Sequence, residues 1–463
     1  MKKIFPKKVF NFILFLCIMA EIVLPSSSAA YNFIFINQET KKPVGYKVDI
    51  SHVYYIDPGP FENYTKEQLR LLVEEAFRVW SSIEDAQLPS FVFGGFLDED
   101  VTGENIDDYI PPQHLCYTDL IPLGEACKNE FIQKNISLIL FDDDSSISEQ
   151  RPLARPYSGA TFQQKITGSP SKPENYLQTS IVISTIHNNF REIFGTLVHE
   201  IGHLFGLAHT SLNQQFIDNV EDDFALQFGK FVPTMFSVKN IGFGLYDQKA
   251  LPKPDDVLGI QNLYPSTNLK SNSASIRGYI VDEDGEYVYL GNIIARNIED
   301  PLCKAYSFIA GNVNCREGDK STCSGPSEFS FNHLPPGAYT IEIEGYANQT
   351  SPEILWPGFN EDTFLASAEY WNIDDQANES PLLKSIISVS ARESVDDIIL
   401  VVDSNNRDEV TFIPESEFSV FAPTTCEEID FLKYQQIITP DLVLSDSASS
   451  SSSSGGCSLI LSP

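Results

Sequence analysis

The eleven residues from His199 to His209 constrain this chain more than any other segment, because three of its seven histidines fall within them at fixed spacings. His199 and His203 are four residues apart, so a helix of about 3.6 residues per turn places both imidazoles on one face. Gly206 can adopt a left-handed conformation that ends this helix and turns the chain back. His209 can then approach the same point from a third side. The spacing therefore predicts a metal site formed by His199, His203 and His209.

Three histidine ligands leave a fourth coordination position for water, which is the arrangement of catalytic zinc sites. Zinc (Zn2+) lowers the pKa of bound water and polarises a carbonyl group, so a nucleophilic side chain is not required. Glu200 directly follows the first ligand, and its carboxylate can accept a proton from that water and deliver it to a leaving amine. We therefore predict zinc-dependent peptide hydrolysis with Glu200 as the catalytic base.

The segment from His199 to His209 reads H-E-x-x-H-x-x-G-x-x-H and resembles the zinc signature of the metzincin metalloproteases. Metzincins also have a methionine in a tight turn beneath the metal. Met235 matches that position, and the two other methionines belong to the first 30 residues; core packing is the alternative role for this side chain. Residues 76–80 and 255–265 resemble the first and last helices of the matrixin branch, which is the matrix-metalloprotease-like group.

This resemblance spans about residues 45–265 and implies an α+β fold. A zincin catalytic domain over residues 31–268 would combine a twisted mixed sheet, with one antiparallel edge strand, and an active-site helix lining the cleft. Two features depart from the matrixin pattern. Matrixins usually have a proline two residues after the turn methionine, where this chain has Ser237. Latent animal members have a propeptide cysteine that occupies the zinc, whereas none of the residues between the predicted signal peptide and the first strand is a cysteine.

Apolar periodicity predicts the elements of this domain. Thr65 and Gln68 resemble a helix capping box, and the apolar residues that follow recur at helical spacing. Asn189 and Glu192 can cap a second helix. The predicted strands are residues 47–56, 91–93, 136–141 and 180–184, and the predicted helices are 66–80, 189–207 and 255–264.

Two other features of this region leave alternatives open. The run Asp142-Asp143-Asp144 could bind a structural calcium ion (Ca2+), as matrixin loops do, or form a solvated acidic loop. Residues 97–131 and 145–177 are long insertions relative to the matrixin pattern, and we expect them to shape the cleft.

Helical periodicity disappears beyond the polar residues 266–275, which predict a linker. Short alternating runs then predict a smaller all-β sandwich domain over residues 269–403. Within it, residues 278–285, 334–341 and 394–400 resemble the carboxypeptidase regulatory-like, transthyretin-like sandwich, which implies a structural or substrate-binding role. The predicted strands are residues 275–281, 287–295, 328–331, 339–344, 385–389 and 397–402.

Residues 1–30 combine four lysines, an apolar run and small residues before a cleavage point, which predicts a signal peptide. An uncleaved membrane anchor is the alternative. The net charge of −33 is unfavourable for binding nucleic acid or anionic lipid. We expect a secreted monomer with no integral membrane segment in the mature chain, whose partner is a protein or peptide substrate.

In a protein outside the cytoplasm, cysteines that lie close in sequence are expected to form disulfides. Cys116 and Cys127 are close in sequence and predict a disulfide; the other connectivities stay open. Residues 404–463 form an extension with a serine-rich low-complexity tail. The segment around Cys457 resembles the start of certain bacterial sorting signals but lacks their membrane helix and basic residues, so surface anchoring through Cys457 is only a hypothesis.

The leading functional hypothesis is therefore a secreted zinc metalloendopeptidase. The alternative is a zinc-containing surface adhesin or binding protein with a vestigial peptidase domain. The intact Glu200 argues against that alternative, because a purely structural zinc site gains nothing from this residue. A third possibility is an enzyme of narrow substrate specificity that processes one surface or host protein.

Overall fold

The computed structural model describes most of the segments that surround the predicted site. These segments are residue 43 and residues 45–110, 136–150, 159–166, 176–184, 190–210, 212–213, 231–236, 250–285, 291–310, 327–344, 369–374, 377 and 380–402. The predicted signal peptide, the Cys116–Cys127 pair and the C-terminal extension lie outside them. The chain combines several sheets with a few helices, and the predicted α+β class is confirmed at this level.

The N-terminal part is built on a five-stranded mixed sheet of order β2-β1-β3-β5-β4. Four strands run parallel, and β4 pairs antiparallel to β5 at one edge. Strand β3 is buried along its whole length, as its continuous apolar sequence predicts. The strands are β1 (Ser51–Ile56), β2 (Ser90–Phe96), β3 (Ile136–Asp142), β4 (Gly159–Ile166) and β5 (Tyr176–Ser184).

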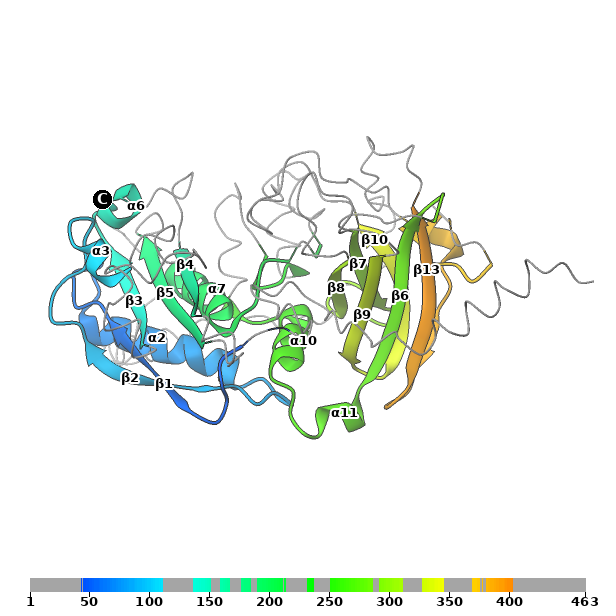
Figure 1. Cartoon of the computed structure of the whole chain (residues 1–463), viewed down its shortest axis with the longest axis horizontal. Coiled ribbons are helices and arrows are strands. Elements are labelled where there is room, and N and C mark those ends of the chain that lie inside the picture. Colours follow the sequence, from blue (N-terminus) through cyan, green and yellow to red (C-terminus); the bar gives the residue numbers. More distant parts are fainter. Residues whose placement is uncertain are drawn as a thin grey trace, which may run out of the picture.

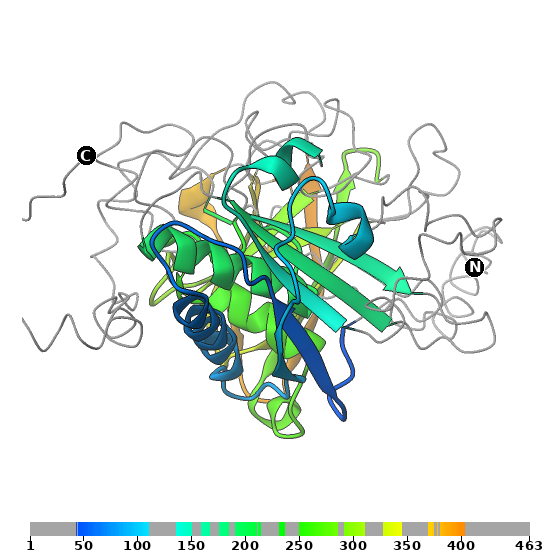
Figure 2. The same ribbon diagram turned by 90° about the vertical axis from the view of Figure 1, so that its left-hand side faces the viewer.

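Two long helices, α2 (Lys66–Ser81) and α7 (Phe190–Phe205), lie on one side of this sheet (Figure 2). The capping box predicted at Thr65 and Gln68 is present, and the apolar face of α2 is buried. The indole Nε1 of Trp80 in α2 donates a hydrogen bond to the carbonyl oxygen of Val198 in α7, at 2.8 Å. This bond crosses the helix pair one residue before His199.

The C-terminal strands form two sheets that pack face to face (Figure 1). Phe308 of one sheet contacts Phe331 of the other, with ring centroids 5.9 Å apart. One sheet has the order β13-β6-β9, and the other has the order β11-β10-β7-β8 with β12 paired to β10. The strands are β6 (Ala274–Asp282), β7 (Gly291–Asn297), β8 (Ala305–Ala310), β9 (Ser327–Leu334), β10 (Gly337–Glu344), β11 (Glu369–Tyr370), β12 (Ile387–Val389) and β13 (Ser394–Val402).

Helix α10 (Pro254–Leu263) lies between the two groups of sheets (Figure 1). Its residues Leu258 and Ile260 belong to a single cluster of buried apolar side chains that extends from α2 and α7 into β6, β9 and β10. The N-terminal and C-terminal parts therefore share one continuous core. The remaining short helices are α3 (Ile106–Tyr109), α6 (Ser146–Gln150), α11 (Leu269–Asn272) and η5 (Pro381–Leu383).

Several local predictions need correction. The predicted linker at 266–275 is instead structured, since it contains α11 and the start of β6, and the Ser273 hydroxyl donates to Leu269 O at 2.7 Å. Strand β4 and helix α6 lie in the insertion 145–177, and β8 and β11 were not predicted. Helix α7 ends at Phe205 rather than near residue 207, because Gly206 turns the chain.

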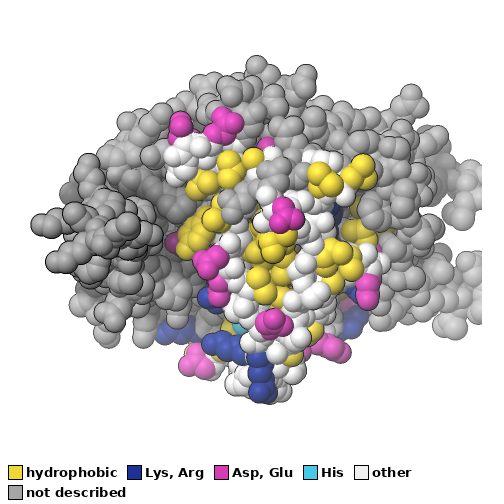
Figure 3. Space-filling view, turned by 90° about the vertical axis from the view of Figure 1, so that its right-hand side faces the viewer, with side chains coloured by type: hydrophobic (Ala, Val, Ile, Leu, Met, Phe, Trp, Pro, Cys, Tyr) yellow, Lys and Arg dark blue, Asp and Glu magenta, His cyan; other side chains and the backbone are white. Residues whose placement is uncertain are grey.

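The surface at the β13 end of the molecule carries apolar side chains among polar ones (Figure 3). Among the described residues of the C-terminal half, the large exposed apolar side chains are those of Ile298, Ile373, Leu382, Leu383 and Ile386. Among the segments described, no helix is long and apolar enough to cross a membrane.

Candidate metal centre

The end of helix α7 brings the third histidine toward the first two. Gly206 has φ 107°, a value that L side chains rarely adopt. Its N–H donates to His203 O at 2.8 Å, and the N–H of Leu207 donates to Gly202 O at 3.1 Å. This is the hydrogen-bond pattern of a Schellman C-cap. The cap reverses the chain so that His209, three residues later, faces the side of the helix that carries His203.

The three imidazoles meet at one point. The Nε2 atom of His209 lies 3.2 Å from Nε2 of His199 and 3.1 Å from Nε2 of His203. One nitrogen from each ring lies within 4.8 Å of the other two. His199 and His203 are buried, and His209 is partly exposed. The structure therefore brings together all three histidines that the spacing predicts.

The opposite nitrogen of each helical histidine faces a backbone carbonyl. His199 Nδ1 lies 2.6 Å from Thr234 O, and His203 Nδ1 lies 2.7 Å from Leu207 O. A carbonyl oxygen accepts only, so both Nδ1 atoms carry the hydrogen and both Nε2 atoms present lone pairs. His209 has a single Nε2 and can donate a hydrogen to only one of these two. A cation that accepts electron pairs would satisfy all three nitrogens together.

The spacing of these nitrogens fits a tetrahedral metal ion. Ligand nitrogens about 2.0–2.1 Å from a tetrahedral zinc are about 3.3 Å from one another. The two Nε2 separations of 3.2 Å and 3.1 Å are close to that value. Neutral imidazoles suit zinc, copper, iron and nickel. The cluster can therefore hold a divalent transition-metal ion.

Met235 lies beneath the histidines. The N–H of Phe236 donates to Pro233 O at 3.2 Å, which closes a tight turn with Met235 inside it. A Cβ built on Gly202 of α7 would come within 2.3 Å of the Met235 sulfur, so helix and turn are in direct contact. Met235 is fully buried. Met235 is thus part of a tight turn and also of the buried apolar cluster.

Asp256 in the first turn of α10 holds the methionine turn. Its carboxylate accepts from the N–H groups of Thr234 at 2.8 Å, Met235 at 2.9 Å and Lys253 at 2.7 Å. Burial raises the pKa of Asp256 to about 6, although these three N–H groups act to lower it. The backbone N–H of Thr234 thus binds Asp256, while the backbone carbonyl of the same residue faces His199 Nδ1. The acidic first turn of α10 was the only sequence signal for this role.

Glu200 is buried beside the first ligand, at 4% exposed. It lies in the same helix turn as His199, so the helix that positions the histidines also fixes the backbone of this residue.

The acidic run Asp142–Asp144 makes hydrogen bonds that do not require an ion. Asp142 accepts from the N–H groups of Ile147 and Ser148, at 3.0 Å and 2.9 Å, and caps α6. Asp143 accepts from Glu62 N at 3.0 Å. Within the described segments, His199, His203 and His209 form the only group of three or more potential metal ligands. The calcium prediction therefore gains no support from this run.

Comparisons with known proteins identify no family. The scan against protein-family models gave no match, and the search of curated proteins gave none at a significant level.

Proposed function

We propose that this chain is a zinc-dependent metalloendopeptidase of the metzincin type, in its matrixin branch. The observation that carries the proposal is the convergence of three imidazole nitrogens, two of them on rings whose Nδ1 faces a backbone carbonyl. The glycine C-cap, the methionine turn and the mixed sheet with one antiparallel edge strand support the same assignment. The proposed zincin catalytic domain contains all of these features.

A zinc ion at this site would supply Lewis acidity, which activates water and polarises a peptide carbonyl. The protein supplies the remaining functions. His199 and His203 are locked in one tautomer by Thr234 O and Leu207 O, so their lone pairs are aimed before any ligand arrives. Glu200 would accept a proton from water in the cleft and deliver it to the leaving amine nitrogen.

We further propose that the protein acts outside the cytoplasm, as a monomer, on protein or peptide substrates. The basic and apolar start of the chain supports export. Cys303 is disulfide-bonded, and such bonds persist in oxidising compartments. N-terminal sequencing of protein recovered from the culture medium would test this; a full-length, cell-associated chain would contradict it.

A prediction about catalysis concerns Glu200. The variant Glu200→Gln should bind zinc like wild type but cleave an unfolded protein substrate at least about a hundredfold more slowly, because the general base is lost. The control is Glu192→Gln, which changes another buried glutamate of the same helix, seven residues before His199. Zinc content by mass spectrometry and cleavage of a peptide library would be measured for both.

The results distinguish the two candidate functions. Retained cleavage in Glu200→Gln would remove Glu200 as the base. Stoichiometric zinc without cleavage of any library peptide by wild type would favour the alternative, a zinc-containing adhesin or binding protein. Absence of zinc binding by wild type would exclude both.

A further inference from the structure

The loop that follows His209 is held by side chains of the C-terminal sheets. Thr210, the next residue, places its hydroxyl 2.9 Å from the Asp255 carboxylate and 2.8 Å from the Ser307 hydroxyl of β8. Ser307 also donates its backbone N–H to Asp255 at 2.7 Å. All three residues are buried. The residue adjacent to the third ligand is thus fixed between α10 and the sandwich.

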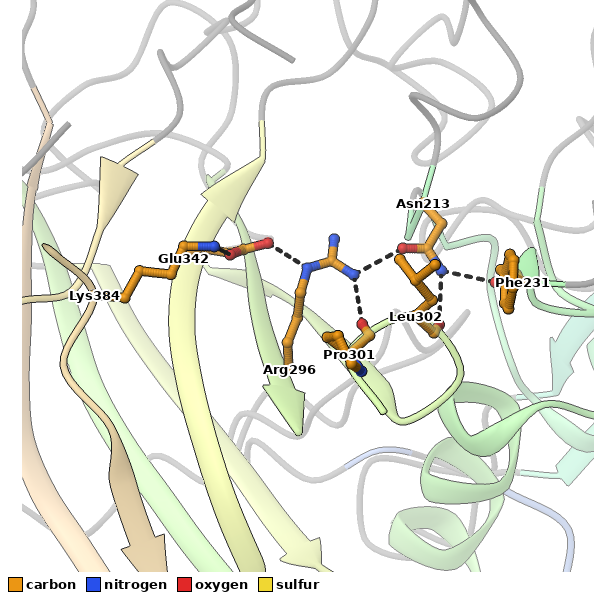
Figure 4. A network of polar contacts seen from close by, with 7 residues as sticks. All are labelled: Asn213, Phe231, Arg296, Pro301, Leu302, Glu342 and Lys384. Carbon is orange, nitrogen blue, oxygen red and sulfur yellow. Dashed lines mark hydrogen bonds and ion pairs between the residues drawn. The ribbon is translucent and has the colours of Figure 1, made fainter. Parts of the chain in front are cut away.

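A second group of hydrogen bonds lies three residues further along, at Asn213 (Figure 4). The side-chain oxygen of Asn213 accepts from the guanidinium of Arg296 in β7 at 2.9 Å. Its amide nitrogen donates to Phe231 O at 2.8 Å and to Leu302 O at 3.2 Å. Phe231 begins the segment that enters the methionine turn. One side chain therefore joins the ligand loop, the methionine-turn segment and the sandwich.

Arg296 is fixed on its other side by charge. Its guanidinium forms an ion pair with Glu342 of β10 and donates to Pro301 O at 3.1 Å. Lys384 contacts the second Glu342 oxygen at 3.1 Å. Burial acts to raise the pKa of Glu342, but Lys384 and Arg296 lower it to about 2. A carboxylate that stays charged keeps the guanidinium aimed at Asn213.

The hydrogen bonds of Thr210 and Asn213 matter because His209 is the one proposed ligand that lies outside a helix. Backbone hydrogen bonds of α7 fix His199 and His203, whereas a loop needs other contacts to hold a side chain in place. Buried charges in a protein interior are costly unless they are paired and hydrogen-bonded, so Arg296 strongly favours one arrangement of its neighbours.

We propose that the C-terminal sandwich is part of the metal centre: Arg296 and Ser307 are positioning residues that hold the loop carrying His209. This inference rests on the proposed metal site. It assigns to the sandwich a role in metal affinity, beyond that of a spacer or an independent binding module.

The test compares metal binding by full-length chains. Asn213→Gly removes the side-chain bonds and tolerates the φ of 61° at this position. Arg296→Met removes the guanidinium, and Ser307→Ala removes one hydroxyl. Each should raise the zinc dissociation constant about tenfold, the usual cost of losing an outer contact of a metal site. The Co(II) absorption spectrum should change in parallel.

Matched controls come from the same sheets. Arg277→Met removes an exposed arginine of β6, whose nearest carboxylate, on Asp396, is 3.9 Å away. Ser330→Ala removes a buried hydroxyl of β9 that donates to Asn332 at 3.1 Å. Both should leave zinc affinity and the Co(II) spectrum unchanged. The double variant Asn213→Gly with Arg296→Met should bind zinc no more weakly than the weaker-binding single variant, since both substitutions remove the same hydrogen bond.

The outcomes separate this inference from the proposed function. Wild-type affinity and spectrum in folded Asn213→Gly and Ser307→Ala chains would overturn the inference and leave the metal site intact. Should Arg296→Met not fold, these two variants decide the question. A wild-type chain that binds neither zinc nor Co(II) would overturn the proposed function, and the inference with it.

Discussion

At the scale of single residues, buried carboxylates hold the turns near the histidine cluster and the sheet ends. Asp142 caps α6, and Asp256 binds three N–H groups around the methionine turn. Asp57, after β1, accepts from the N–H groups of Gly59 at 3.0 Å and Val101 at 3.3 Å. In each case hydrogen bonds from backbone N–H groups offset part of the cost of burying the carboxylate.

Asp57 gives a prediction about pH. Burial raises its pKa from 3.8 to about 7, with a smaller upward contribution from Asp100. The folded chain therefore binds an extra proton between these values, and Asp57 makes the protein less stable as the pH rises through this interval. Asn does not ionise, so Asp57→Asn should not show this loss. The unfolding free energy of Asp57→Asn minus that of wild type should therefore be larger at pH 8 than at pH 4.5, by on the order of a few kcal/mol.

Urea unfolding of both proteins at the two pH values measures this difference. Asp284→Asn, in an exposed turn, serves as the control and should follow wild type. Identical pH dependence for Asp57→Asn and wild type would show that Asp57 ionises in the folded state as it does in the unfolded chain.

At the scale of elements, helix α7 and its C-cap establish the geometry of the site. The helix carries two of the three proposed ligands and the proposed base, and its cap turns the chain toward the third histidine. The same helix packs against Trp80 and Met235 at Gly202, where a Cβ would come within 2.7 Å of the indole ring and 2.3 Å of the sulfur. The helix therefore has little freedom to rotate or shift beneath the histidines.

The C-cap gives a second prediction. Gly206→Ala introduces a Cβ at φ 107°, which should cost about 1–2 kcal/mol of stability and lower zinc affinity, because the turn toward His209 changes. Gly285→Ala is the matched control, since Gly285 has φ 75° and open space around it. Thermal unfolding and zinc competition titrations measure the two effects. Equal zinc affinities for the two variants would mean that the cap does not direct His209.

At the scale of the whole molecule, one apolar core joins the N-terminal sheet, α10 and the C-terminal sheets. The polar ties at Ser307 and Arg296 cross the same boundary. Folding of the loop that carries His209 and folding of the sandwich should therefore be coupled.

The coupling gives a third prediction. Saturating zinc should raise the unfolding temperature of wild type in one cooperative transition, because a ligand that binds only the folded state stabilises everything that unfolds with it. Amide hydrogen exchange in β8 and β10 should slow along with that in α7. The His203→Gln chain is the control and should not respond to zinc. Protection confined to α7, with unchanged exchange in β8 and β10, would show that the two parts unfold independently.

The sequence by itself determined the features that depend on neighbours along the chain. The four-residue spacing of His199 and His203, the C-cap at Gly206 and the capping box at Thr65 follow from helix geometry, and the structure has all three in place. The α+β class follows from where helical periodicity stops. Strands β4, β8 and β11 escaped prediction because their pairing partners, rather than their own patterns, stabilise them.

Only the tertiary structure decided how the site is held. The carbonyl that orients His199 comes from Thr234, 35 residues away, and the tie to Arg296 crosses 83 residues from Asn213. No periodicity reports contacts over such separations, since they depend on how sheets and helices pack. The sequence predicted which three histidines come together, and packing determined which carbonyls, carboxylates and sandwich residues hold them in place.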